Sequence, residues 1–194
     1  MNPLIEKFKN YQIILASNSP RRQELLKGLD LDFTIETKDV NEDYNSDLKG
    51  KEITEYLAYK KAQAFGELTT NEVVITADTI VWFKNKALEK PKNTIEAIKM
   101  LQELSGNIHK VITSVSIKTS LKSKIFTTTT KVHFKKLSTQ EIAYYVNNYK
   151  PFDKAGSYGI QEWFGYVAVE KIEGSYFNVM GLPVHKLYEE LLKI

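Results

Sequence analysis

The chain has 194 residues, of which 42% are hydrophobic and 26% charged, and this balance is typical of a globular protein of ordinary size and not of a disordered chain. It contains no cysteine, which excludes disulfides, thiol nucleophiles and thiolate metal sites and is consistent with a reducing cytosol. The formal charge of +3 is too small to indicate a nucleic-acid partner, and the sequence has neither a signal-peptide pattern at its start nor an apolar run of membrane length, so we expect a cytoplasmic protein with no membrane partner.

Hydrophobic periodicity and turn residues predict strands and helices that alternate along the chain. A buried strand over residues 13–16 leads directly into a helix that begins at Pro20, with Ser19 as its N-cap. A second helix is predicted over residues 51–65, and a strongly apolar strand over residues 73–83.

The middle of the chain contains a helix and a predicted hairpin. The helix over residues 94–104 ends at Ser105-Gly106, because glycine is a common residue just past a helix end. Apolar and polar residues alternate over residues 111–117 and again over 126–134, on either side of a turn at 120–124. This pattern predicts two long antiparallel strands.

The last third opens with a helix and closes with one. Ser138 and Glu141 have the spacing of a capping box, which predicts a helix that continues to Tyr149. A strand is then predicted over residues 165–172 and a short helix from Pro183. Because strands and helices interleave around a hairpin, we expect an α/β fold with a mixed sheet.

Arg21 and Arg22 are the only arginines among the 27 basic residues, and they are adjacent. Guanidinium groups bind phosphate or carboxylate through two parallel hydrogen bonds, whereas a lysine acts as a point charge. Together with Ser17, they lie in or just before the first turn of the predicted helix, where unpaired backbone N–H groups attract anions. The segment is therefore predicted to bind an anion; the alternative is an ordinary turn with solvated arginines.

Asp78 interrupts a strand that is otherwise strongly apolar, and Thr79 follows it with a hydroxyl group. A buried carboxylate must be paired, metal-bound or at the rim of a cleft, because burying it alone is very costly. A structural role, in which Asp78 caps neighbouring backbone, is the alternative. By its spacing, Lys61 lies on the apolar side of its predicted helix. Its side chain therefore either points towards a site or extends its ammonium group to solvent.

Other polar residues say less when taken singly. Lys90 before Pro91 is unremarkable, and Glu42 lies in an acidic stretch that would ordinarily be a solvated loop. Residues 153–161 form a glycine-bearing loop that ends in Gln161, whose amide is able to read both a donor and an acceptor on a base edge. A plain hairpin turn or helix entry is the alternative there. The three histidines, including His109, show no metal-ligand spacing.

Taken together in chain order, these segments resemble one family. They are Ser17 to Leu26, Lys61-Ala62, Ala77-Asp78-Thr79, Glu89-Lys90-Pro91, Ser105-Gly106 with His109, Asp153 to Gln161, and Gly174 to Pro183. This set resembles the Maf proteins, also called septum-formation inhibitors, over nearly the whole chain. The order and number of the matching segments make the resemblance specific, although no single segment would.

The resemblance implies a single Maf-like domain over residues 1–194, with a fold related to the inosine-triphosphate pyrophosphatases. It implies an elongated mixed sheet flanked by helices, two lobes with a central cleft, and usually a homodimer. It also implies an enzyme that uses a divalent metal, Mg²⁺ or Mn²⁺, to hydrolyse a nucleoside triphosphate between its α- and β-phosphates. No nucleic acid is expected as a partner.

The same resemblance assigns roles to individual residues. The expected catalytic residues are Asp78, as proton acceptor, Lys61 and Lys90. The expected substrate-binding residues are Ser17, Arg21, Arg22, Thr79 and Gln161. The expected metal ligands are Glu42 and Asp78.

Arg21, Thr79 and Gln161 match the branch of the family that acts on dTTP and UTP, which implies pyrophosphate release from these or from modified pyrimidine triphosphates. The chain departs from the usual pattern at four positions: Ser114, Lys150, Glu162 and Trp163. A nucleotide-sensing regulator of cell division with little turnover is the alternative function.

Overall fold

The computed structural model describes residues 2–194, and within them seven strands form one mixed sheet. In sheet order the strands are β2 (Thr34–Ile35), β1 (Gln12–Leu15), β3 (Glu72–Phe83), β5 (Ile108–Lys118), β6 (Ser123–Phe134) and β7 (Val169–Glu173), and β4 (Lys86–Leu88) pairs with β3 outside this path. β1 is parallel to β2 and β3, whereas β4 is antiparallel to β3, and β7 to β6. The predicted α/β class with a mixed sheet is confirmed.

Helices flank this sheet. They are α1 (Pro3–Lys7), α2 (Pro20–Lys27), α3 (Lys51–Gln63), α4 (Thr94–Leu104), α5 (Thr139–Tyr149), the 3₁₀ helix η1 (Ala155–Ser157), α6 (Trp163–Ala168), α7 (Tyr176–Met180) and α8 (Val184–Leu191). The predicted capping box is present: the Ser138 hydroxyl accepts from the N–H of Glu141, and the Glu141 carboxylate accepts from the N–H of Ser138. None of the helices described in residues 2–194 combines the length and apolar character needed to cross a lipid bilayer.

The chain divides into two compact units. The first contains Met1–Asp78, Thr113–Thr128 and Gly181–Ile194, and the second contains Thr79–Ile112 and Thr129–Met180. Strands β3, β5 and β6 therefore contribute residues to both units. The single domain and the central cleft expected from the sequence stay predictions.

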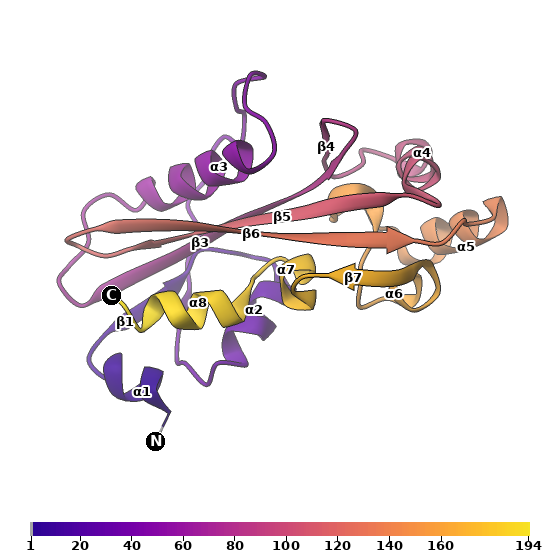
Figure 1. The fold of residues 1–194 in the computed structure, drawn as a ribbon. Helices are drawn as coiled ribbons and strands as arrows, with labels where there is room; N and C mark the ends of the chain where they lie inside the picture. The colour runs from indigo at the N-terminus through magenta and orange to yellow at the C-terminus, as the bar shows by residue number, and fades with distance from the viewer. Residues whose placement is uncertain (1) are drawn as a thin grey trace. The chain divides into compact units, whose positions relative to one another are not determined.

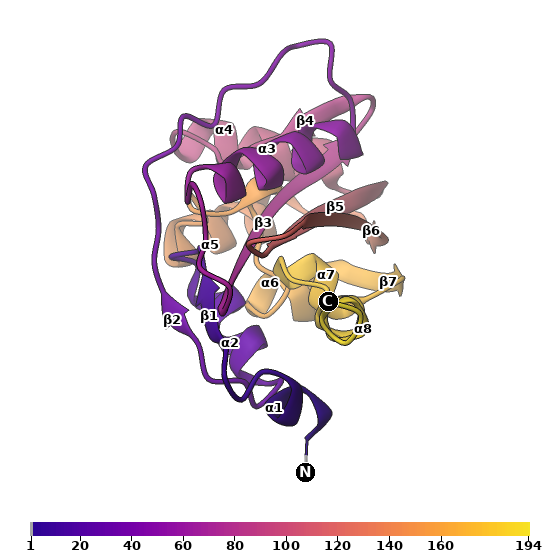
Figure 2. The same ribbon diagram turned by 90° about the vertical axis from the view of Figure 1, so that its left-hand side faces the viewer.

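In the first unit, α3 and α8 lie on opposite sides of the closed end of the β5–β6 hairpin (Figure 2). Hydroxyl groups join α3 to the hairpin: Thr54 Oγ1 lies 2.6 Å from Ser114 Oγ, which lies 2.8 Å from Thr127 Oγ1. On the other side, the buried Glu190 carboxylate of α8 forms an ion pair with Lys124. Ser114, one of the departures from the family pattern, is therefore a structural residue that links strand to helix.

In the second unit, α4, α5 and α6 gather around the ends of β5 and β6 (Figure 1). Aromatic rings fill the space between them, with Phe134 at 5.3 Å and Tyr145 at 4.7 Å from Phe164, measured between ring centroids. Tyr145 and Phe164 are fully buried. Such edge-on and tilted aromatic contacts stabilise a core through both area and ring electrostatics.

The strand predicted over residues 165–172 is wrong in its first half. Residues up to Ala168 belong to α6, and only β7 is extended. Phe164 and Ala168 lie one helical turn apart and are both fully buried, and a Cβ at Gly165 would lie 1.8 Å from the Ile160 carbonyl oxygen. This tight packing of a helix outweighs the alternation of apolar residues that suggested a strand.

Candidate functional site

Asp78 and Lys61 meet inside the first unit. Lys61 projects from α3 and donates a hydrogen bond from Nζ to Asp78 Oδ1 over 2.7 Å. The helix is held against the strand nearby, because Thr76 Oγ1 donates to the Ala58 carbonyl over 2.6 Å. Asp78 is therefore paired, which is one of the arrangements expected for a buried carboxylate. Of the two directions left open for Lys61, the structure shows the one away from solvent, since its side chain is only 17% exposed.

The electrostatics of Asp78 have two opposing contributions. With 7% of its surface exposed, the residue is buried, and burial raises the pKa of its carboxyl above the ordinary value. The Lys61 ammonium opposes that rise in pKa, as does the guanidinium of Arg22 more weakly. Asp78 is thereby a stronger base than an exposed aspartate, while its neighbouring cations favour the ionised form.

Glu42 joins this cluster from the loop before α3. Its Oε1 lies 2.9 Å from Lys61 Nζ, so the lysine lies between two carboxylates. Composition alone does not distinguish Glu42 from its acidic neighbours, whereas its contact with Lys61 does.

The Asp78 and Glu42 carboxylates supply the type of ligand atom that a divalent cation prefers. Mg²⁺ prefers oxygen ligands and is commonly held by one or two carboxylates together with substrate phosphates and water. Asp78 and Glu42 supply such oxygens, and among residues 2–194 no group of three or more His, Cys, Asp or Glu side chains forms a fuller set. The donor set therefore suits a cation shared with a phosphate ligand, and metal dependence stays a prediction.

Arg22 is fixed within the first unit by backbone carbonyls. Its Nε donates to the Gly181 carbonyl and its Nη1 to the Ala77 carbonyl, each over 2.9 Å. Nη1 also lies 3.5 Å from Ser17 Oγ, which accepts from the N–H of Ser19 over 3.2 Å. The guanidinium fork thus joins the start of α2 to β3, which argues against the alternative of a solvated arginine.

Of the remaining predicted site residues, Arg21 lies on α2 in the first unit, whereas Thr79, Lys90 and Gln161 belong to the second unit. Lys90 is exposed in the segment that follows β4. The preceding carbonyl, that of Glu89, accepts from the N–H of Gly156 over 3.3 Å, so the segment of Lys90 is hydrogen-bonded to the loop of Gln161. Their assembly with Asp78 into one site stays a prediction.

The loop before Gln161 is shaped by contacts within the protein. Gly156 has φ of 69° and Ser157 of 63°, the left-handed region that disfavours most side chains. A Cβ at Gly156 would lie 2.7 Å from Val81 Cγ2, and one at Gly159 would lie 2.7 Å from the carboxyl carbon of Glu162. At both positions the space that a Cβ would need is filled by atoms of the chain itself.

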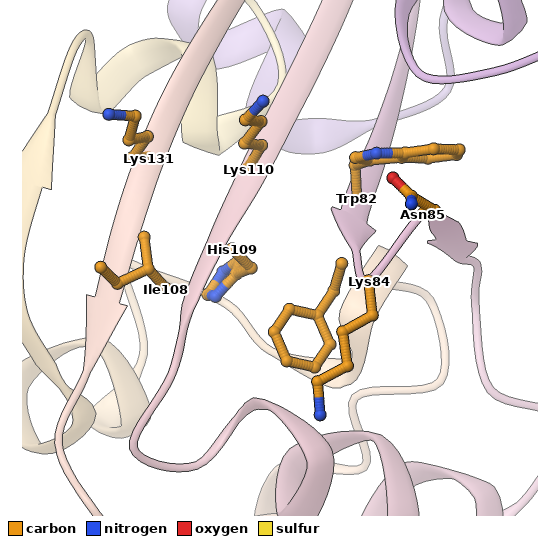
Figure 3. A pocket seen from close by; sticks show the side chains of 8 residues that line it. Trp82, Lys84, Asn85, Ile108, His109, Lys110 and Lys131 are labelled. Atoms are coloured by element: carbon orange, nitrogen blue, oxygen red, sulfur yellow. The ribbon is translucent and has the colours of Figure 1, made fainter.

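A separate feature of the second unit is a pocket of about 440 Å³ (Figure 3). Its lining residues are Trp82, Phe83, Lys84, Asn85, Ile108, His109, Lys110 and Lys131. The buried His109 donates to or accepts from the Tyr158 hydroxyl at 2.7 Å through Nε2, and burial together with His133 lowers its pKa to about 3. None of the lining residues is a predicted catalytic or substrate-binding residue.

The chain is similar to known proteins over nearly its whole length. A family described as Maf-like protein matches residues 12–194. A protein of Flavobacterium johnsoniae named dTTP/UTP pyrophosphatase is 59% identical over 189 residues, which cover 97% of each chain. A protein of the same name from Bacteroides fragilis is 51% identical, covering 98% of this chain and 100% of its own. A HAM1 protein structure from Coxiella burnetii has a TM-score of 0.44 and 16% identity, covering 64% of this chain and 73% of that one.

Proposed function

Because the chain belongs to the Maf-like protein family, we propose that it is a pyrophosphatase that hydrolyses dTTP and UTP to the monophosphate and pyrophosphate. Two relatives that bear the name dTTP/UTP pyrophosphatase match it over nearly its full length. The observation that carries the proposal in this chain is the buried Asp78 carboxylate held by Lys61. A buried, ionised carboxylate beside fixed cations suits hydrolysis of an anionic substrate.

In the proposed reaction, water attacks the α-phosphorus and the bond from that phosphorus to the bridging oxygen breaks. Asp78 orients the water and accepts its proton, for which the raised pKa of its buried carboxyl is favourable. The bridging oxygen leaves with the pyrophosphate. Lys61 holds the carboxylate in position through its 2.7 Å contact.

Negative charge grows on the departing pyrophosphate, and fixed cations stabilise it. Arg21, Lys61 and Lys90 are the side chains proposed to do so, and Arg22 with Ser17 fixes the start of α2, which carries Arg21. Glu42 and Asp78 are the proposed ligands of Mg²⁺ or Mn²⁺. When bound, such an ion neutralises phosphate charge and orients the reacting groups.

Preference for a pyrimidine is proposed to come from the second unit. The Gln161 amide would pair with the edge of the base, because an amide offers one donor group and one acceptor group. Thr79 would close the pocket around a small base. We propose further that the enzyme acts in the cytoplasm as a homodimer, for which the absence of cysteine and the family resemblance are the support.

The direct test is pyrophosphate release from purified protein with a panel of dTTP, UTP, CTP, dATP and GTP, in Mg²⁺, in Mn²⁺ and in chelator. We expect turnover of dTTP and UTP that chelator abolishes and either metal restores. Turnover that resists chelator would remove the metal from the proposal, and preference for purine triphosphates would remove the pyrimidine pocket. Binding of triphosphates without turnover would instead favour a nucleotide-sensing regulator.

A further inference from the structure

The loop that carries Gln161 is held by a buried tyrosine. The Tyr145 hydroxyl, which projects from α5, accepts a hydrogen bond from the N–H of Gly159 over 2.9 Å. It donates its own proton to Glu162 Oε2. Tyr145 has no exposed surface. One hydroxyl therefore links the backbone two residues before Gln161 to the side chain immediately after it.

Glu162 is held on its other side by a lysine. Its Oε1 lies 3.0 Å from Nζ of Lys154, whose side chain is 11% exposed. Lys154 also contacts Asp153 at 2.7 Å, so the ammonium is shared between two carboxylates. The Glu162 carboxylate thus accepts from Tyr145 with one oxygen and from Lys154 with the other.

Backbone hydrogen bonds stabilise the same turn. The N–H of Glu162 donates to the Gly159 carbonyl over 3.2 Å, so both backbone polar groups of Gly159 are used within the turn. Ile160, between them, is buried with 9% of its surface exposed. Gln161 is therefore the half-buried member of a turn whose other residues are fixed by hydrogen bonds or burial.

The directions of these hydrogen bonds are determined by chemistry. A backbone N–H only donates and a carboxylate only accepts, so the single Tyr145 proton must lie towards Glu162. Burial, with Glu162 contributing, raises the pKa of the Tyr145 hydroxyl above its usual range, which keeps the proton in place. A glutamine at 162 would keep the shape but would lose the charge that Lys154 and Tyr145 both bind.

We propose that Glu162, Tyr145 and Lys154 form a positioning unit that fixes the direction of the Gln161 amide and thereby sets the preference for pyrimidine triphosphates. The inference rests on the proposed function, in which Gln161 reads the base. It gives Glu162, a departure from the family pattern, a role in specificity without contact with substrate. A misdirected amide weakens base pairing but leaves the reacting groups of the first unit unchanged.

Glu162→Gln and Tyr145→Phe test this proposal in the full-length protein. For each variant, kcat and KM are measured with UTP, dTTP and dATP, and the affinity for a UTP analogue with a methylene group between the α- and β-phosphates is measured by calorimetry. We expect KM for UTP and dTTP to rise about tenfold, as the loss of one buried hydrogen bond would cause, with kcat within about twofold and the preference over dATP reduced. The double variant should lose no more than the worse single variant, because the residues act through one turn.

Glu141→Gln provides the matched control. Glu141 also lies on α5 and also loses charged and backbone partners on substitution, but these partners are Lys135 and the N–H of Ser138, which precede α5 in the chain. It should lower stability and leave KM and preference unchanged. If Glu162→Gln and Tyr145→Phe behave like this control, the positioning unit is merely structural and the proposal is wrong.

The outcomes also separate this inference from the proposed function. A wild-type protein that binds the analogue without hydrolysing UTP or dTTP would overturn the function, while the analogue affinities of the variants would still decide the role of the turn. A wild-type protein that neither turns over nor binds these nucleotides would overturn both. Wild-type turnover with variants of unchanged KM would overturn only the inference.

Discussion

The two units hold their important side chains by different means. In the first, ionised groups hold one another: Lys61 lies between Asp78 and Glu42, and Arg22 is fixed by carbonyls. In the second, the Tyr145 hydroxyl joins a backbone N–H to Glu162 around Gln161, and one ion pair, Lys154 with Glu162, supports that turn. Charges placed in a buried environment favour chemistry on an anion, whereas a turn fixed by short-range hydrogen bonds favours selection of a base. The comparison suggests that catalysis and recognition are separable by mutation.

The largest expected effect comes from Asp78→Asn. Asparagine keeps the size of the side chain but is unable to accept a proton from water, so we expect kcat to fall about a thousandfold. KM for dTTP should change much less than kcat, because the asparagine carbonyl oxygen is still able to bind a cation while acceptance of the proton is lost. Steady-state pyrophosphate release gives both constants, and Asp32→Asn, an exposed change in the same unit, is the control. Activity within about tenfold of wild type would contradict the role of Asp78 as base.

Arg21 and Arg22 are expected to have different roles within the first unit, one in substrate binding and one in stability. Arg22→Lys loses the fork that reaches both Gly181 and Ala77, and we expect it to lower the free energy of unfolding by about 2 to 3 kcal/mol. Arg21→Lys should leave the free energy of unfolding nearly unchanged. It should lower kcat/KM instead, because the guanidinium of Arg21 is proposed to bind phosphate. Urea unfolding and steady-state kinetics measure the two quantities. Equal effects of the two substitutions on stability would show that Arg22 is not the structural member of the pair.

The smallest effect belongs to His109 in the second unit. Its pKa falls from 6.5 to about 3 on folding, because burial and the nearby His133 disfavour its charged form, while Tyr158 binds its neutral ring. The unfolded chain therefore binds a proton that the folded chain does not, and stability is lost as pH falls below 6.5. Between pH 6.5 and 5.5 the loss should be about 1 kcal/mol.

Urea unfolding at pH 7.5, 6.5 and 5.5 measures this dependence, and His109→Gln is the matched variant because glutamine does not titrate. The difference in slope between the two proteins isolates the histidine from the carboxylates, which they share. An identical pH dependence in both proteins would mean that folding does not lower the pKa of His109.

Local signals in the sequence predicted much of the fold and part of the site. The capping box at Ser138 and the strand that contains Asp78 depend on neighbouring residues, and both are as predicted. The helical spacing of Lys61 allowed an inward direction and a solvent-directed one, and the structure shows the inward one. In each of these cases the determining interaction lies within a few residues of the chain.

The rest depends on contacts between distant residues. Glu162 meets Tyr145 across 17 positions, and no local pattern predicts that contact. Glu42 meets Lys61 from a loop with several similar acidic residues, so only the family resemblance, and no local pattern, singled it out. The helix α6 was mistaken for a strand because its packing against Ile160 is not visible in an apolar alternation. Sequence reasoning therefore located the charged groups better than the turn that is proposed to direct recognition.

The separation of catalysis from recognition is tested most directly by comparing Asp78→Asn with Gln161→Ala, using dTTP and dATP as substrates. If catalysis and recognition are separate, Asp78→Asn lowers kcat for both nucleotides and leaves KM nearly unchanged. Gln161→Ala then raises KM for dTTP and removes the preference over dATP, with kcat retained. If Gln161→Ala lowers kcat equally for both nucleotides and leaves the preference for dTTP intact, catalysis and recognition are not separate, and the proposed roles of the two units are wrong.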